Sequence, residues 1–135
     1  MELAAAILCD HVSVREGLLI VVGGGITRLW RENLPAPLNV ELALLLEMSS
    51  MELGGSHEVA VVVIDEDGGE VARFQGGLQV GARDLDPGET QLVPLAVKFG
   101  PTGVSHHGRY SMEISLDGRH VQSVGFRVLP RNLRQ

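Results

Sequence analysis

Arg109–Leu116 has the sequence RYSMEISL and His120–Val128 has the sequence HVQSVGFRV, and the two segments are joined across Asp117-Gly118. Both segments alternate apolar and polar residues. An alternation of period two directs one face of a strand inward and the other outward, and Asp-Gly is a turn signal. We therefore expect a half-buried β-hairpin at the C-terminal end of the chain.

The apolar residues of this hairpin also restrict its register. If Asp117-Gly118 were a simple two-residue loop, Tyr110 would lie opposite Gly125, and Phe126 would share a face with Arg109. The apolar set would then be divided over both faces, which a half-buried hairpin does not tolerate. A bulge or an odd-length loop, such as a three-residue loop with Gly118 in the left-handed conformation, restores one apolar face.

Similar patterns recur along the whole chain. His57–Ile64 and Glu70–Phe74 flank Asp67-Gly68-Gly69 as a second hairpin, and Pro94 favours a sheet-edge position for its strand. The other expected strands are Met1–His11, Leu18–Val22, Ile26–Trp30, Leu38–Met48 and Gln91–Phe99. We expect an all-β chain, a two-layer antiparallel β-sandwich of about eight strands, forming one domain over residues 1–135.

The charge balance bears on the partners. The chain has 11 basic and 17 acidic residues, a net charge of −6 and an isoelectric point near 5.3. A nucleic-acid surface needs clustered lysine and arginine. The basic residues are scattered along the sequence, apart from Arg127, Arg131 and Arg134, which a solvated tail explains. We therefore expect no nucleic-acid partner.

The single cysteine, Cys9, excludes an intrachain disulfide and fits a reducing compartment. The apolar run Leu3–Cys9 is short, follows an acidic residue and does not resemble a signal peptide. No run approaches the ~18 apolar residues of a transmembrane helix. These features predict a cytoplasmic protein without a membrane partner.

Gly23-Gly24-Gly25 invites a nucleotide-binding interpretation. A dinucleotide fingerprint needs a third glycine where Arg28 stands, and the Gly-Lys-Ser/Thr ending of a phosphate-binding loop is absent. Triple glycine between two strand segments is instead typical of a bulge or a sharp corner. We expect a corner, with at least one glycine at positive φ.

The acidic run Asp65-Glu66-Asp67 is a candidate calcium site. An EF-hand loop that began at Asp65 would need glycine at its sixth position and glutamate at its twelfth, which here are Glu70 and Gly76. The loop fails both requirements. A turn built by aspartate and glycine is the favoured interpretation.

Histidine and cysteine supply the other candidate ligands. Cys9 and His11 share a face of an extended strand and form a possible zinc-binding pair, but no Cys-x-x-Cys or His-x-x-x-His partner accompanies them. His106 and His107 are adjacent and point to opposite sides of an extended chain. Asp10 faces away from Cys9, and no Gly-x-Ser-x-Gly elbow occurs. We therefore assign no catalytic, cofactor-binding or metal-binding residue and expect no cofactor.

Three motifs resemble a family of small bacterial proteins that carries only a label for a domain of unknown function. They are Leu8-Cys9-Asp10, the run Glu16-Gly17-Leu18 to Val22-Gly23-Gly24-Gly25, and His57-Glu58-Val59 to Ile64-Asp65-Glu66-Asp67-Gly68. The resemblance spans Leu8 to about Val80, and Leu18 departs from a frequent lysine. It implies a bacterial cytoplasmic β-domain and no activity.

Surplus apolar surface suggests a function. Val59–Ile64 and Met1–Cys9 are apolar on both faces, and exposed apolar patches mark interfaces. We expect a non-catalytic interaction or assembly module that self-associates, as a homodimer, and has an unknown protein partner. The alternatives are an enzyme dependent on a small ligand or a metal, with Cys9, His11 and His106-His107, and a calcium-responsive module with Asp65–Asp67.

Overall fold

The computed structural model describes residues 1–81 and 84–131. In this part of the chain there are eleven strands and no helix, so no helix could cross a membrane. The strands are β1 (Glu2–Arg15), β2 (Leu18–Gly24), β3 (Arg28–Trp30), β4 (Ala36–Pro37), β5 (Glu41–Ser49), β6 (Ser56–Asp65), β7 (Glu70–Gln79), β8 (Thr90–Lys98), β9 (Gly103–Val104), β10 (Gly108–Leu116) and β11 (Arg119–Leu129).

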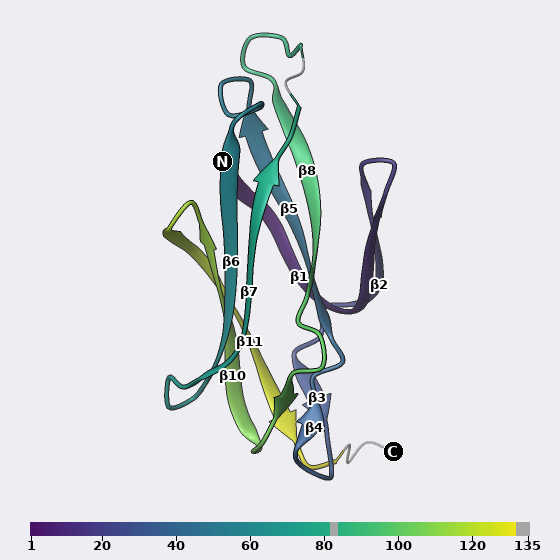
Figure 1. Cartoon of the computed structure of the whole chain (residues 1–135). Helices are drawn as coiled ribbons and strands as arrows, with labels where there is room; N and C mark the ends of the chain where they lie inside the picture. The colour runs from purple at the N-terminus through teal and green to yellow at the C-terminus, as the bar shows by residue number, and fades with distance from the viewer. Residues whose placement is uncertain (82–83, 132–135) are drawn as a thin grey trace.

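Two main sheets form a sandwich-like fold, as Figure 1 shows. One has the order β2-β1-β5-β8, the other has the order β3-β11-β10-β6-β7, and one of the two is curled into a half-barrel. The expected all-β sandwich is confirmed, and Pro94 lies on β8 at a sheet edge, as expected. The number of strands exceeds eight because very short strands are included, among them β4 and β9 with two residues each.

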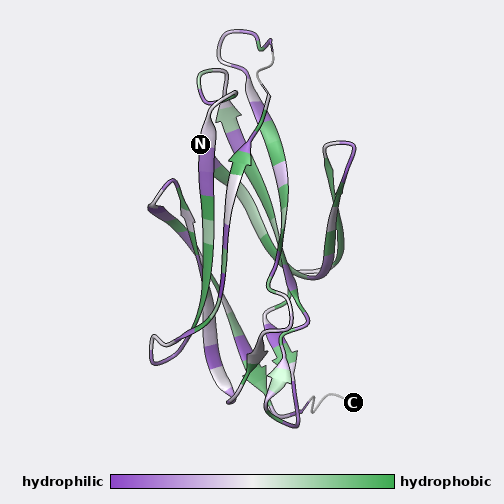
Figure 2. Cartoon of the chain, in the orientation of Figure 1, coloured by the Kyte–Doolittle hydropathy of each residue, from purple (hydrophilic) through white to green (hydrophobic). Residues whose placement is uncertain are grey.

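The core lies between the two main sheets and is built by alternation. On β5 the side chains of Leu42, Leu44 and Leu46 are completely buried, and on β6 the same is true of Val59 and its alternate neighbours. Figure 2 shows the apolar stretches along the strands and the hydrophilic residues in most of the turns. Burial of these aliphatic side chains, at roughly 1.5–3 kcal/mol each, is the main force that holds the sheets together.

The C-terminal hairpin has the expected apolar face, because Tyr110 pairs with Phe126. Asp117 and Gly118 form a two-residue turn with φ angles of 49° and 79°, a conformation that suits the twist of a hairpin. A register shift after Ile114 restores the apolar face. The bulge and the left-handed Gly118 were predicted correctly, whereas the three-residue loop was not.

The long strand β1 takes part in both the four-stranded sheet and a two-stranded ribbon. Its first half pairs with β5, and its second half pairs with β2 in a ribbon that extends away from the sandwich (Figure 1). The inner face of the ribbon packs over the outer face of the sheet, where Cys9, Val12 and Ala43 form a small second core. Glycines end the ribbon: Gly23 has φ 63° and Gly25 has φ 91°, which confirms the predicted corner.

Candidate functional site

Three arginines from distant parts of the sequence form a row across the five-stranded sheet. Arg127 on β11 pairs with Arg28 on the parallel strand β3 and with Arg109 on the antiparallel strand β10. All three side chains are exposed, and they line one depression together with Thr27 and Gly125. Neighbouring strands lie ~4.8 Å apart, so the backbone positions of the row span roughly 10 Å.

The arginine row, defined as Arg28, Arg127 and Arg109, has no counter-ion in the described part of the chain. Within residues 1–81 and 84–131, no carboxylate oxygen lies within 4.0 Å of these guanidinium groups. Like charges directly opposite each other on a sheet are destabilising. A guanidinium presents a planar fork of donors that matches phosphate and carboxylate oxygens. The row is therefore a candidate site for an anion.

Gly125 contributes backbone surface to this depression. It lies opposite Ser111 and beside Arg127 on the outer face, and a Cβ built on it would meet only the carbonyl oxygen of Tyr110, at 3.9 Å. The position therefore has room for a small side chain, and the glycine leaves the space between the arginines open. A flat or extended anionic group can approach the backbone there.

The candidate calcium residues lie beside one end of the row. The Asp65 carboxylate accepts hydrogen bonds from the backbone N–H groups of Asp67, at 3.0 Å, and Gly69, at 2.8 Å, so it closes the turn as the favoured interpretation predicts. The carboxylate of Glu66 lies over Gly108, because a Cβ at Gly108 would come within 2.6 Å of it. Burial, and to a lesser degree the charges of Asp65 and Glu66, raises the pKa of the nearby Tyr110 hydroxyl.

The two adjacent histidines contact different parts of the structure. The His106 ring stacks on Tyr110 with a centroid separation of 5.5 Å, and its Nε2 atom lies 3.8 Å from Asp65 Oδ2. The Nε2 atom of His107 lies 2.7 Å from the carbonyl oxygen of Arg31. Their opposite orientations agree with the sequence expectation, and they do not converge on a common ligand.

Cys9 and His11 both lie next to Glu41 on β5. The buried Cys9 thiol donates to the Glu41 carbonyl oxygen at 3.4 Å, and His11 Nδ1 lies 2.9 Å from Glu41 Oε1. Burial, followed by the negative charges of Glu41 and Asp10, raises the pKa of the Cys9 thiol, which disfavours the thiolate that zinc requires. In the described residues, no group of three or more histidine, cysteine or acidic side chains could hold a metal ion.

The carboxylate of Glu41 also joins three strands. It accepts a hydrogen bond from the backbone N–H of Val12 at 2.9 Å, and Lys98 Nζ lies 3.1 Å from its other oxygen. Burial by itself would raise the pKa of Glu41, but the bonds from Val12 and Lys98 outweigh it and lower that pKa. Sequence reasoning missed this residue, which fixes the ribbon to the sheet.

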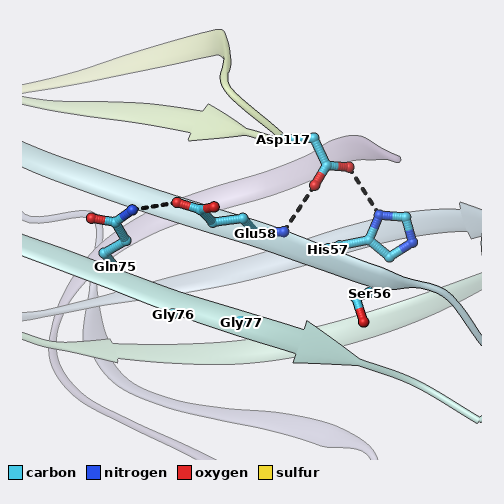
Figure 3. Close-up of a pocket in the computed structure, with 7 residues that line it drawn as sticks. All are labelled: Ser56, His57, Glu58, Gln75, Gly76, Gly77 and Asp117. Carbon is cyan, nitrogen blue, oxygen red and sulfur yellow. Dashed lines mark hydrogen bonds and ion pairs between the residues drawn. The ribbon is translucent and has the colours of Figure 1, made fainter.

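A second depression contains a histidine and an aspartate in contact (Figure 3). His57 Nδ1 lies 2.9 Å from Asp117 Oδ2, and its Nε2 lies 2.8 Å from the carbonyl oxygen of Glu52. The hydrogen bond from His57 lowers the pKa of Asp117, and the Glu58 backbone N–H contributes to the shift. Because both ring nitrogens already have partners, neither is free to take a proton from a substrate.

Serine, histidine and glutamate meet on the outer face of β10 and β11. Ser123 Oγ donates to Glu113, His120 Nε2 lies 2.9 Å from Glu113 Oε2, and the same Nε2 lies 3.3 Å from Ser123 Oγ. A catalytic triad needs the acid on one ring nitrogen and the nucleophile on the other. This cluster uses one nitrogen for both and does not have the connectivity of a triad.

Comparison with solved structures gives a slight likeness to the Pseudomonas fluorescens alkylpurine DNA glycosylase AlkC bound to DNA containing an abasic site analog. The identity is 15%, the TM-score is 0.45, and the match covers 92% of this chain and 30% of that one. The chain thus spans less than a third of the length of that protein. A search of curated proteins finds no match.

The expected partners, a second copy of the chain and no nucleic acid, require correction. The structure that matches is a DNA complex, and nothing found supports a homo-oligomer. The two segments that suggested surplus apolar surface, Met1–Cys9 and Val59–Ile64, are largely covered within the chain, since only Ile7 among their large hydrophobic residues is exposed, at 38%. Exposed apolar side chains lie instead on the β1–β2 ribbon, at Val14, Leu18, Ile20 and Val22. The basic residues are also less scattered than the sequence suggests, because the sheet brings Arg28, Arg109 and Arg127 together. Arg134, which the sequence placed in a solvated tail, lies outside the described residues.

A family model matches residues 4–129, which is nearly the whole described chain and extends well beyond the segment that carried the sequence resemblance. The chain therefore belongs to a family of unknown function, DUF6941.

Proposed function

We propose that this chain is a non-catalytic binding module that recognises an anionic ligand through the arginine row. The observation that carries the proposal is the pairing of Arg28, Arg127 and Arg109 across three adjacent strands with no carboxylate in ion-pair contact among the described residues. A bound anion would remove the mutual repulsion of the row and use its donors. We also infer a bacterial cytoplasmic location: the resemblance described above implies a bacterial protein, and the single cysteine, Cys9, fits a reducing compartment.

The side-chain clusters with a catalytic composition support a role without catalysis. His57 has acceptors on both ring nitrogens, and His120 uses one nitrogen for both of its partners. Neither histidine is arranged to activate a nucleophile and to receive its proton. The arginine row, in contrast, is open and charged and needs no further group in order to bind.

Isothermal titration calorimetry with sodium tripolyphosphate at low salt tests the proposal. We expect binding whose affinity falls with salt, because bound phosphate displaces counter-ions and the interaction is screened. Arg127→Gln should weaken binding at least about tenfold, since a charge-assisted hydrogen bond contributes roughly 1.5–3 kcal/mol.

Arg73→Gln is the matched control. Arg73 lies on the same sheet, is exposed, and is already paired with Glu70 at 2.7 Å. Its substitution changes the net charge by the same amount but leaves the row intact, so the affinity should stay within about twofold of the original. Equal losses in the two variants, or no binding by the original protein, would refute the proposal.

A further inference from the structure

The only tryptophan of the chain lies at the end of the arginine row. Trp30 follows Arg28 by two residues on β3, and Leu29 between them faces the core with 5% exposure. Side chains two residues apart on a strand share a face, at a spacing of roughly 6.6 Å. Trp30 is half-buried, so it presents part of its surface on the face that carries Arg28.

Hydrogen bonds hold the chain rigidly just after this tryptophan. The Arg31 guanidinium donates to the carbonyl oxygens of Trp30, at 2.9 Å, and Leu38, at 2.7 Å. The backbone N–H of Arg31 donates to the carbonyl oxygen of Leu129 at 2.8 Å. These bonds hold the backbone at the strand end that carries the indole, which lowers the entropic cost of ordering this segment when a planar group stacks there.

Cationic side chains beside an aromatic ring are the combination that binds single-stranded nucleic acids, whose phosphates contact the cations while bases stack on the ring. We propose that the anion recognised by the arginine row is the phosphate backbone of a single-stranded nucleic acid, with one base stacked on Trp30. This inference rests on the proposed function and names its ligand. An acidic peptide would satisfy the arginines but has no base for the indole.

The charge of the chain predicts the strength of binding. The chain carries a net charge of −6. This charge opposes a polyanion, so we expect weak binding that depends strongly on salt.

Fluorescence anisotropy with a labelled 12-nucleotide oligothymidylate, at roughly 50 mM salt, tests the inference. Arg127→Gln should weaken the binding of both oligothymidylate and tripolyphosphate. Trp30→Leu should weaken oligothymidylate binding about five- to a hundredfold, the range for loss of one stacked base, and leave tripolyphosphate binding unchanged. Arg73→Gln should change neither.

The protein's own fluorescence gives a second measurement that needs no variant. Since Trp30 is the single tryptophan, oligothymidylate should quench its emission and tripolyphosphate should not. If Trp30→Leu folds poorly, Trp30→Phe takes its place in the test. It retains an aromatic ring and should therefore keep part of the affinity that stacking provides.

The outcomes separate the two proposals. If tripolyphosphate binds through the row but oligothymidylate neither quenches Trp30 nor depends on it, the nucleic-acid inference is wrong and the anion-binding function stands. A poly-glutamate peptide that competes as well as oligothymidylate would overturn the inference in favour of an acidic protein segment. If neither phosphate ligand binds, both proposals are wrong.

Discussion

Removing the carboxylate of Glu41 should loosen the β1–β2 ribbon from the sheet. The strongest contact of this carboxylate is the hydrogen bond that it accepts from Val12 N–H at 2.9 Å. The donor, Val12, is completely buried. A hydrogen bond to a charged group contributes about 1.5–3 kcal/mol. The ion pair with Lys98 adds little, because that side chain is 51% exposed and such pairs contribute about 0–1 kcal/mol. We therefore expect Glu41→Ala to lower the free energy of unfolding by about 2–3 kcal/mol at pH 7.

Urea unfolding followed by Trp30 fluorescence measures this loss, with Lys98→Ala as the control. Lys98→Ala removes the ion pair but keeps the Val12 hydrogen bond, so it should cost less than about 1 kcal/mol. Equal losses for the two variants would mean that the exposed pair, rather than the Val12 hydrogen bond, holds the ribbon.

The pH dependence supplies a second check, in which Glu41→Gln preserves the size of the side chain. The pKa of Glu41 is lowered in the folded protein, because the Val12 and Lys98 bonds outweigh the opposing effect of burial. Its charge therefore contributes stability above the unfolded-state pKa of about 4.3, and this contribution disappears as the pH falls through the lower folded-state pKa. The difference in stability between the original protein and Glu41→Gln should shrink as the pH falls below about 4. A difference that stays constant from pH 7 to pH 3 would refute the assignment.

Four further predictions concern other parts of the structure. Phe126→Ala should cost about 3–5 kcal/mol in a urea titration, because Phe126 is 3% exposed and stacks on a neighbouring ring at 5.5 Å; a loss below 1 kcal/mol would contradict its place in the core. Arg127→Gln should leave the free energy of unfolding unchanged or raise it by up to about 0.5 kcal/mol, since it relieves like-charge repulsion; a clear loss would show that the row is structural. Gly23→Ala should cost more than about 1 kcal/mol without any ligand, because φ is 63° and the new Cβ would lie 3.1 Å from Asp10 Cβ; thermal unfolding measures it, and no loss would contradict the corner. The pKa of Glu113, followed by NMR titration, should lie below its usual value and rise in Ser123→Ala, because the Ser123 hydrogen bond is the largest cause of the shift; an unchanged pKa would contradict that cause.

The C-terminal hairpin illustrates how much of the fold follows from sequence. The positions of Tyr110, Met112 and Phe126 require one extra residue in the hairpin if the apolar residues are to share a face. Alternation determines that this residue exists but not where it lies. The Asp117-Gly118 pair adopts the two-residue turn that suits a twisted hairpin, and the irregularity falls within the strands, after Ile114.

The arginine row could be predicted only in part. Once Tyr110 is placed opposite Phe126, their outward neighbours Arg109 and Arg127 must also face each other, so two of the three arginines were already paired in the restored register. Arg28 could not be added, because β3 is three residues long and joins β11 in parallel, and no local pattern specifies that pairing. The Glu41 contacts could not be predicted from the sequence for a similar reason, since they join β5 to β1 and β8, and no local pattern specifies those pairings.

The charge balance does not by itself exclude a polyanion, because net charge is a property of the whole chain and binding is local. At physiological ionic strength the field of an exposed charge decays over about 8 Å, so distant carboxylates do little to neutralise a cluster. Several acidic groups are also engaged elsewhere: Glu41 with Lys98, Glu70 with Arg73, and Glu113 with His120. An anion at the row would therefore experience three guanidinium groups that have no carboxylate in ion-pair contact among the described residues. A sheet that places scattered arginines in register can create a cationic surface on an acidic protein, at the cost of mutual repulsion that a bound anion would relieve.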